Sequence, residues 1–278
     1  MNRYFRKLNI TKFILIMFVS YVILIGGYIF ATIFPNRNLE SYLTVAFYVV
    51  LFLGYFGFSL NPEDREAIFY EDDEVRKPWS LAFAPFFIMG LTTMFYVLLL
   101  ESFFPKLFDS FINAPNIMED LNFGENPVAY ILLFISIVLL APVVEEIVFR
   151  GILFNLLNKK RGLLFSMIVS SIFFGILHAE TMVPTAVIGF VLCLIYQTTG
   201  SLKLSMAGHM FNNLVAFMLP FLIGDMAPES NAYIVLNAAL FFAYTGISIY
   251  FISYMVKNRG AFKGNSPVYR ARGERFDL

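Results

Sequence analysis

Charge, cysteine and histidine are all scarce in this 278-residue chain. Charged residues make up 14% of it, against about 25% in ordinary soluble domains, which argues against a soluble globular protein. The 20 basic residues equal the 20 acidic ones, so net charge gives no sign of a nucleic-acid partner. The single cysteine, Cys193, excludes an internal disulfide and a cysteine-based metal cluster. Only two histidines occur, His178 and His209, so their positions are informative.

Long apolar runs make up much of the chain. Hydrophobic residues make up 59% of the chain, and the mean hydropathy is +0.71. Several runs reach the ~20 residues that a membrane-spanning helix needs. The sequence therefore predicts an all-α, polytopic membrane protein with about eight transmembrane helices. The expected spans are residues 13–34, 42–60, 80–100, 128–148, 163–179, 182–198, 204–223 and 232–256, the fourth with a continuation to 157 left open.

Basic residues between these runs predict the orientation, because cytoplasmic loops collect Lys and Arg. Eight spans place 18 of the 20 Lys and Arg residues on the side of the two termini. Only Arg37 and Lys106 fall on the opposite side. We therefore expect cytoplasmic termini and an uncleaved first span, with the protein in a bacterial cell membrane, as the Ile-, Phe- and Asn-rich composition suggests.

Two acidic residues interrupt the apolar runs. Glu145 and Glu146 lie in the fourth span, whereas the other acidic residues lie in loops, tails or span edges. A charge at membrane depth costs at least ~2.5 kcal/mol, so such carboxylates indicate a function. Helical spacing lets Glu146 pair with Arg150 four residues later, while Glu145, about 100° away, is free for another partner. We also expect Pro142 to bend the helix just before the pair. The alternative is a pair near the membrane boundary, neutralised by Arg150 and solvent.

Both histidines of the chain lie in expected spans, like the two glutamates. His178 ends the fifth span, and His209 lies near the start of the seventh, with Asn213 four residues further on the same helical face. A histidine in a span can also be a hydrogen-bonded packing residue. Measured along straight helices from the cytoplasmic basic residues 159–161, Glu145 lies ~21 Å deep and His178 ~26 Å deep, which are comparable depths. His209 lies only ~9 Å from Lys203, so a shared site requires helix tilt, the Pro142 bend or a protruding 158–162 loop.

Carboxylates and imidazoles together can deprotonate a water molecule, either directly or through a metal ion. Two histidines and one carboxylate form a known catalytic zinc ligand set, so Glu145, His178 and His209 are candidate ligands and zinc is a candidate cofactor. Imidazole and amide groups can also donate hydrogen bonds to a developing oxyanion. The chemistry that fits is the hydrolysis of a carbonyl compound, most plausibly a peptide bond.

Three motifs carry a family resemblance: Glu145-Glu146-x-x-x-Arg150, Phe174-x-x-x-His178 and His209-x-x-x-Asn213. In this order they resemble those of the CAAX prenyl protease 2 (Ras-converting endopeptidase) and bacterial Abi family, also called CPBP, of intramembrane glutamate or metallo-proteases.

The resemblance covers about residues 125–223. It implies a chain divided into N-terminal spans (1–124), a catalytic core (125–223) and a last span with a basic cytoplasmic tail (224–278). It implies further that Glu145 activates the attacking water with help from His178, and that His209 and Asn213 stabilise the oxyanion. Glu146 and Arg150 would support the site. Whether a metal is needed stays open.

The leading hypothesis is an intramembrane endopeptidase that hydrolyses a membrane-associated or lipidated peptide or protein. Its expected partners are that substrate and the lipid bilayer, with no nucleic acid. A non-catalytic membrane scaffold or bacteriocin-immunity protein is a second reading. A proton-coupled transporter is a third, although the chain shows no inverted repeat.

Overall fold

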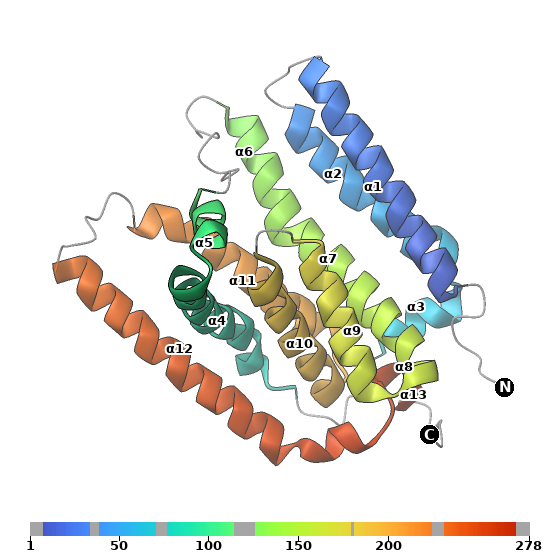
Figure 1. Cartoon of the computed structure of the whole chain (residues 1–278). Helices are drawn as coiled ribbons and strands as arrows, with labels where there is room; N and C mark the ends of the chain where they lie inside the picture. Colours follow the sequence, from blue (N-terminus) through green and yellow to red (C-terminus); the bar gives the residue numbers. More distant parts are fainter. Residues whose placement is uncertain are drawn as a thin grey trace.

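The computed structural model describes residues 8–33, 39–70, 77–113, 126–178, 181–223 and 231–270. All regular secondary structure in these ranges is helical (Figure 1). The α-helices are α1 (Ile10–Ile33), α2 (Leu39–Phe52), α3 (Pro62–Ile68), α4 (Ala84–Phe103), α5 (Pro105–Ile112), α6 (Pro127–Phe134), α7 (Ala141–Glu146), α8 (Asn155–Arg161), α9 (Leu163–Ile176), α10 (Met182–Thr199), α11 (Leu202–Ile223), α12 (Asn231–Lys257) and α13 (Pro267–Arg270). The π-helices are η1 (Leu53–Ser59), η3 (Ile135–Leu140) and η4 (Ile147–Phe154), and the 3-10 helices are η2 (Trp79–Phe83) and η6 (Arg259–Lys263).

Six helical stretches of the described residues are long and apolar enough to cross a bilayer. They are 10–30, 41–59, 79–103, 127–161, 182–199 and 233–257. The expected spans at 163–179 and 204–223 are largely helical too, as α9 and α11, but neither is among those six. The all-α, multi-pass membrane architecture is therefore confirmed, while the count of eight and the cytoplasmic termini stay predictions. Residues 1–7 and 271–278, at the two ends, lie outside the described ranges.

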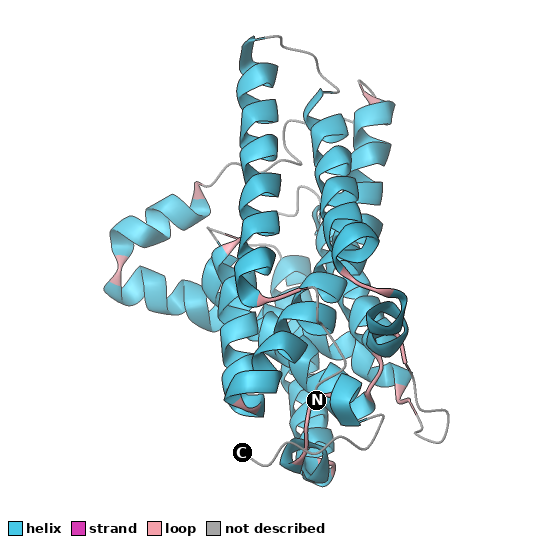
Figure 2. Cartoon of the chain, turned by 90° about the vertical axis from the view of Figure 1, so that its right-hand side faces the viewer, coloured by secondary structure: helices cyan, strands magenta, loops and turns pink. Residues whose placement is uncertain are grey.

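Burial orders the helices from the centre of the bundle to its lipid-facing edge. In α10, 61% of the spanning window is buried inside the protein, against 11% in α1 and 17% in α12. Helix α10 accordingly lies in the middle of the molecule, with the α1–α2 pair on one side and α12 on the other in Figure 1, and Figure 2 shows the same helical bundle turned by 90°. The exposed apolar side chains of α1 and α12 suit a lipid environment rather than water.

The stretch 127–161 is one continuous helical run with two π-helical sections. Sections η3 and η4 flank the α-helical piece α7, which carries Pro142 and both glutamates. In η3 the amide of Ala141 donates to the carbonyl of Ser136, five residues back. Pro142 has no amide hydrogen to continue the pattern. Beside Pro142, where we expect a bend, the structure has a change in hydrogen-bond spacing, of the kind that often marks functional sites.

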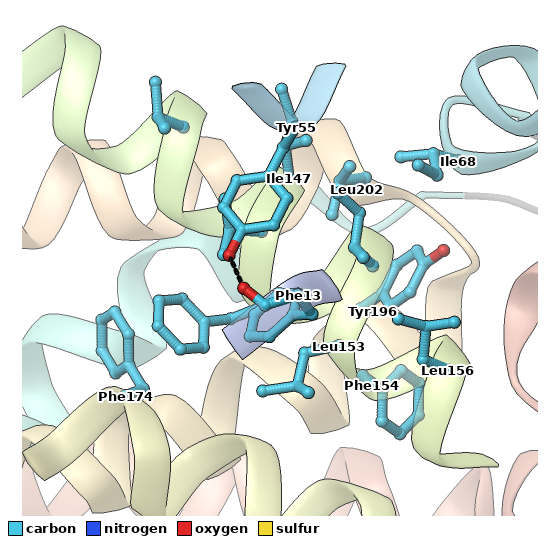
Figure 3. Close-up of a cluster of buried hydrophobic side chains, with 14 of the residues drawn as sticks. Phe13, Tyr55, Ile68, Ile147, Leu153, Phe154, Leu156, Phe174, Tyr196 and Leu202 are labelled. Carbon is cyan, nitrogen blue, oxygen red and sulfur yellow. Dashed lines mark hydrogen bonds between the residues drawn. The ribbon is translucent and has the colours of Figure 1, made fainter. Parts of the chain in front are cut away.

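Helices α1 and η1 are anchored to this run by a cluster of buried side chains (Figure 3). The hydroxyl of Tyr55 donates to the carbonyl oxygen of Phe13 at 2.7 Å, and their rings lie 5.0 Å apart. Both side chains belong to the same core cluster as Ile147, Leu153 and Phe154 of η4. The N-terminal helices therefore pack directly against the helix that carries the glutamates.

Close packing of α9 against α10 predicts the effect of one added methyl group. A Cβ at Gly175 would lie 2.5 Å from the Met182 carbonyl oxygen and 2.7 Å from the Ala186 Cβ, whereas a Cβ at Gly246 of α12 would meet nothing within 4 Å. We expect Gly175→Ala to destabilise the fold by about 1–3 kcal/mol through overpacking. Gly246→Ala should be neutral or slightly stabilising, as in other helix interiors. Thermal unfolding of both variants in detergent measures this, and equal melting temperatures would contradict the proposed close approach.

Candidate functional site

The six candidate catalytic and supporting residues come from four neighbouring parts of the bundle. Glu145 and Glu146 end α7, and Arg150 lies one turn later in η4. His178 lies in the turn that follows α9, and α11 carries His209 and Asn213.

Glu146 is the more deeply buried of the two carboxylates. It is fully buried and accepts hydrogen bonds from Arg150 Nη1 at 2.7 Å and from Ser205 Oγ at 2.6 Å. Its Oε1 also lies 3.0 Å from His209 Nδ1. The ion pair expected from the four-residue spacing of Glu146 and Arg150 is confirmed. A buried charge needs this combination of an opposite charge and further hydrogen bonds.

Arg150 is held in turn by backbone and aromatic contacts. Its Nη2 donates to the Gly189 carbonyl at 3.0 Å, and its guanidinium lies 4.4 Å from the Phe174 ring centroid. A Cβ at Gly189 would approach Arg150 Nη2 to 3.3 Å and Phe174 to 3.1 Å. Glycine therefore allows α10 to come near enough for its carbonyl to accept this hydrogen bond.

Glu145 shares His209 with Glu146 but also contacts α2, which its rotation on the helix allows. Its side chain is 13% exposed, and its Oε2 lies 3.8 Å from His209 Nε2. The hydroxyl of Tyr48, on α2, donates to Glu145 Oε1 at 3.0 Å. His209 thus stands between the two glutamates, with one ring nitrogen toward each of them.

A cavity of about 160 Å³ opens beside Glu145. Since a water molecule occupies about 30 Å³ in the liquid, the cavity has room for water or for one apolar side chain. Glu145 and His178 both line it, and the remaining lining residues are Met17, Tyr21, Phe47, Tyr48, Leu51, Val144, Val148, Phe149 and Leu177. The cavity therefore joins two expected catalytic residues to an otherwise mainly apolar and aromatic wall.

Hydrogen bonding indicates the tautomers of both imidazoles. His178 Nδ1 lies 2.8 Å from the Phe174 carbonyl oxygen, which can only accept, so Nδ1 carries the proton and Nε2 is left as an acceptor. His209 Nδ1 similarly faces the Glu146 carboxylate. The Phe174 ring lies 4.7 Å from the His178 ring and 5.6 Å from the His209 ring, so it contacts both imidazoles.

Asn213 makes a contact with the helix backbone that the sequence does not reveal. Its Nδ2 donates to the carbonyl of Ile137 at 2.9 Å. The amide of Ala141, the usual α-helical partner of that carbonyl, donates instead to Ser136, and Pro142 has no amide hydrogen. Asn213 therefore satisfies a carbonyl that the π-helical section and the proline leave without a helical donor.

The mismatch in depth between His209 and Glu145 disappears in the structure. The turn between α10 and α11 is buried, with Ser201, Leu202 and Leu204 at most 1% exposed. Gln197, just before it, donates to the carbonyls of Ala261 and Asn265 in the segment after α12. This end of α11 is covered by protein, and the His209 and Glu145 side chains meet at 3.8 Å, so the distance along the helix from Lys203 does not measure the depth of His209.

A zinc site does not emerge from the candidate ligands. Within the described part of the chain, no group of three or more His, Cys, Asp or Glu side chains is placed to hold a metal ion. The candidate ligands Glu145, His178 and His209 therefore do not form a three-ligand site in this arrangement.

Three contact residues were missed by sequence reasoning. Ser205 could have been found, because it precedes His209 by four residues on the same face of α11. Gly189 contributes through its backbone, and Tyr48 lies 97 residues from its partner Glu145. Neither of these two follows a local pattern.

Comparisons with known proteins place this site in a family context. Residues 127–215, about a third of the chain, match the sequence model "Type II CAAX prenyl endopeptidase Rce1-like". The chain is 32% identical over 83 residues to the "Putative membrane peptidase YdiL" of Bacillus subtilis, covering 29% of this chain and 34% of that protein. It is 37% identical over 97 residues to an uncharacterized protein of Mycoplasma capricolum, covering 32% and 28%. No solved structure gives a significant match.

These matches span about a third or less of the curated relatives' own length. The family-model match spans all the motif residues, from Glu145 to Asn213. Both relatives are bacterial, which is consistent with a bacterial origin for this multi-pass membrane protein. The family resemblance predicted from the three motifs is therefore confirmed for residues 127–215, which are similar to the Rce1-like type II CAAX prenyl endopeptidases.

Proposed function

We propose that the protein is an intramembrane endopeptidase that hydrolyses a peptide bond of a membrane-associated or lipidated substrate. The observation that carries this proposal is that Glu145 and His178 line one cavity large enough for water. The similarity of the site-bearing segment to Rce1-like endopeptidases and to a protein named as a membrane peptidase supports it.

In the proposed reaction, Glu145 removes a proton from a water molecule in the cavity. His178 Nε2, free to accept, holds the other hydrogen of that water and orients its lone pair toward the substrate carbonyl. The water oxygen bonds to the carbonyl carbon, and the carbonyl oxygen becomes an oxyanion. When the carbon–nitrogen bond breaks, the proton held by Glu145 passes to the leaving amine, so Glu145 returns to its carboxylate form.

We assign stabilisation of the oxyanion to His209 and Asn213 on α11. The Asn213 amide has two hydrogens, of which one goes to the Ile137 carbonyl, and we assign the other to the oxyanion. For His209 to donate through Nε2 as well as Nδ1, both ring nitrogens must carry a hydrogen, and carboxylate oxygens of Glu145 and Glu146 face these two nitrogens. Glu146 and Arg150 thus support the site by holding His209.

The role of Glu145 can be tested with a single amide substitution. Glu145→Gln keeps the shape of the side chain but cannot accept the proton, so peptide cleavage should fall by about 10²- to 10⁴-fold. Purified protein in liposomes is incubated with a library of membrane-anchored peptides, and mass spectrometry detects new termini. Glu101→Gln, at an exposed position of α4, is the matched control and should cleave like wild type. Full cleavage by Glu145→Gln would refute water activation by this residue.

The support role of Arg150 predicts losses of both stability and activity. Arg150→Ala leaves Glu146 buried without its counter-charge and should destabilise the fold by about 3–5 kcal/mol. The exposed Arg161→Ala should have little effect. The double variant Glu146→Gln/Arg150→Met removes both charges and should regain much of the stability without regaining cleavage, because His209 loses its ionised partner. Melting temperatures and cleavage rates are compared, and an active double variant would show that Glu146 is not needed to hold His209.

A further inference from the structure

We propose that Tyr48 is a positioning residue that holds the Glu145 carboxylate in the orientation needed for water activation. The kinetic part of this inference rests on the proposed function, whereas the hydrogen bond itself does not. Tyr48 belongs to α2, outside the matched segment 127–215.

The contacts of Glu145 are divided between its two oxygens. Tyr48 donates to Oε1 at 3.0 Å, and His209 Nε2 lies 3.8 Å from Oε2. A carboxylate with one fixed donor cannot rotate freely about its terminal bond, so its remaining lone pairs keep a set direction. Because both Glu145 and Tyr48 line the cavity, that direction is set at the cavity wall.

The hydroxyl of Tyr48 is itself held in place by packing. Its ring meets the Phe47 ring edge-on at 5.3 Å, and Phe47 in turn meets the Tyr21 ring of α1 at 5.1 Å. Helix α2 also packs against α6, η3 and α7 of the glutamate-bearing run. The phenol is thus a preset donor rather than a mobile surface group, as a positioning residue requires.

A half-buried phenol could serve packing alone, so the test separates the hydroxyl from the ring. Tyr48→Phe removes only the donor and keeps the aromatic contacts. Tyr28→Phe is the matched control, because the hydroxyl of Tyr28 on α1 pairs with Thr44 on α2 at 3.2 Å but Tyr28 lies outside the cavity lining.

Kinetics give the first measurement. We expect Tyr48→Phe to lower kcat by about 10- to 100-fold, since misplacement of a reacting group by about 1 Å can cost as much. KM should stay within about three-fold, because the ring that faces the substrate is unchanged. Tyr28→Phe should leave both parameters at wild-type values. Wild-type kcat in Tyr48→Phe would overturn the proposal, whether or not KM is raised.

Chemical labelling of Glu145 gives a second measurement that does not depend on proteolysis. An apolar carbodiimide, dicyclohexylcarbodiimide, reacts with carboxyl groups inside membranes, and mass spectrometry of the digested protein reports the fraction of Glu145 modified. Removing the hydroxyl leaves Glu145 Oε1 without its donor, so Glu145 in Tyr48→Phe should be labelled several-fold faster than in wild type and in Tyr28→Phe. Glu145→Gln, which has no carboxyl group at this position, is the blank.

If labelling changes but wild type cleaves no peptide, the hydrogen bond stands and the proposed peptidase function fails. If Tyr48→Phe and Tyr28→Phe label alike, the positioning role fails whatever the protein cleaves. If Tyr48→Phe does not fold, Tyr48→Trp keeps an aromatic ring without the hydroxyl and takes its place in the same comparison.

Discussion

The burial of Glu146 is the constraint on which the rest of the site depends. A carboxylate with no exposure inside an apolar bundle requires compensation from every side. Arg150 supplies the counter-charge, Ser205 a hydroxyl donor and His209 a ring nitrogen. These partners come from η4 and α11, so satisfying one charge brings two separate helices into register. The orientation of His209, and with it the approach to Glu145, follows from this requirement.

The backbone around Pro142 imposes a second requirement of the same kind. A π-helical section followed by a proline leaves the Ile137 carbonyl without a helical donor, and Asn213 supplies one. Side chains on α11 therefore compensate both a buried charge and a backbone defect on the neighbouring run. His209 and Asn213, four residues apart, do this from a single helical face. Structural compensation and the proposed oxyanion contacts thus use the same two residues, so substituting either affects both.

Sequence reasoning found the parts of this arrangement that local spacing governs. Apolar run lengths predicted the membrane helices, and the four-residue interval predicted the Glu146–Arg150 pair. It could not find the π-helical sections, because their hydrogen-bond spacing depends on packing that no short pattern encodes. Tyr48 was missed for a related reason, since its partner lies 97 residues away and a tyrosine in an apolar helix is unremarkable in sequence. The depth of His209 was misjudged because exposed Lys203 sits beside a turn that the chain after α12 covers.

The cavity draws its two walls from different stretches of the chain. Glu145, His178 and the aliphatic residues around them come from the segment that carries the motifs, whereas Met17, Tyr21, Phe47, Tyr48 and Leu51 come from α1 and α2. Apart from Tyr48, the α1–α2 wall touches the space without taking part in the proposed chemistry. Because Phe47 and Tyr21 hold Tyr48 in place, a change to this wall also reaches the proposed chemistry unless these aromatic contacts are kept. Under the proposed function, exchanging the α1–α2 residues of the wall other than Tyr21, Phe47 and Tyr48 is expected to alter substrate preference while Glu145 and His178 stay in place.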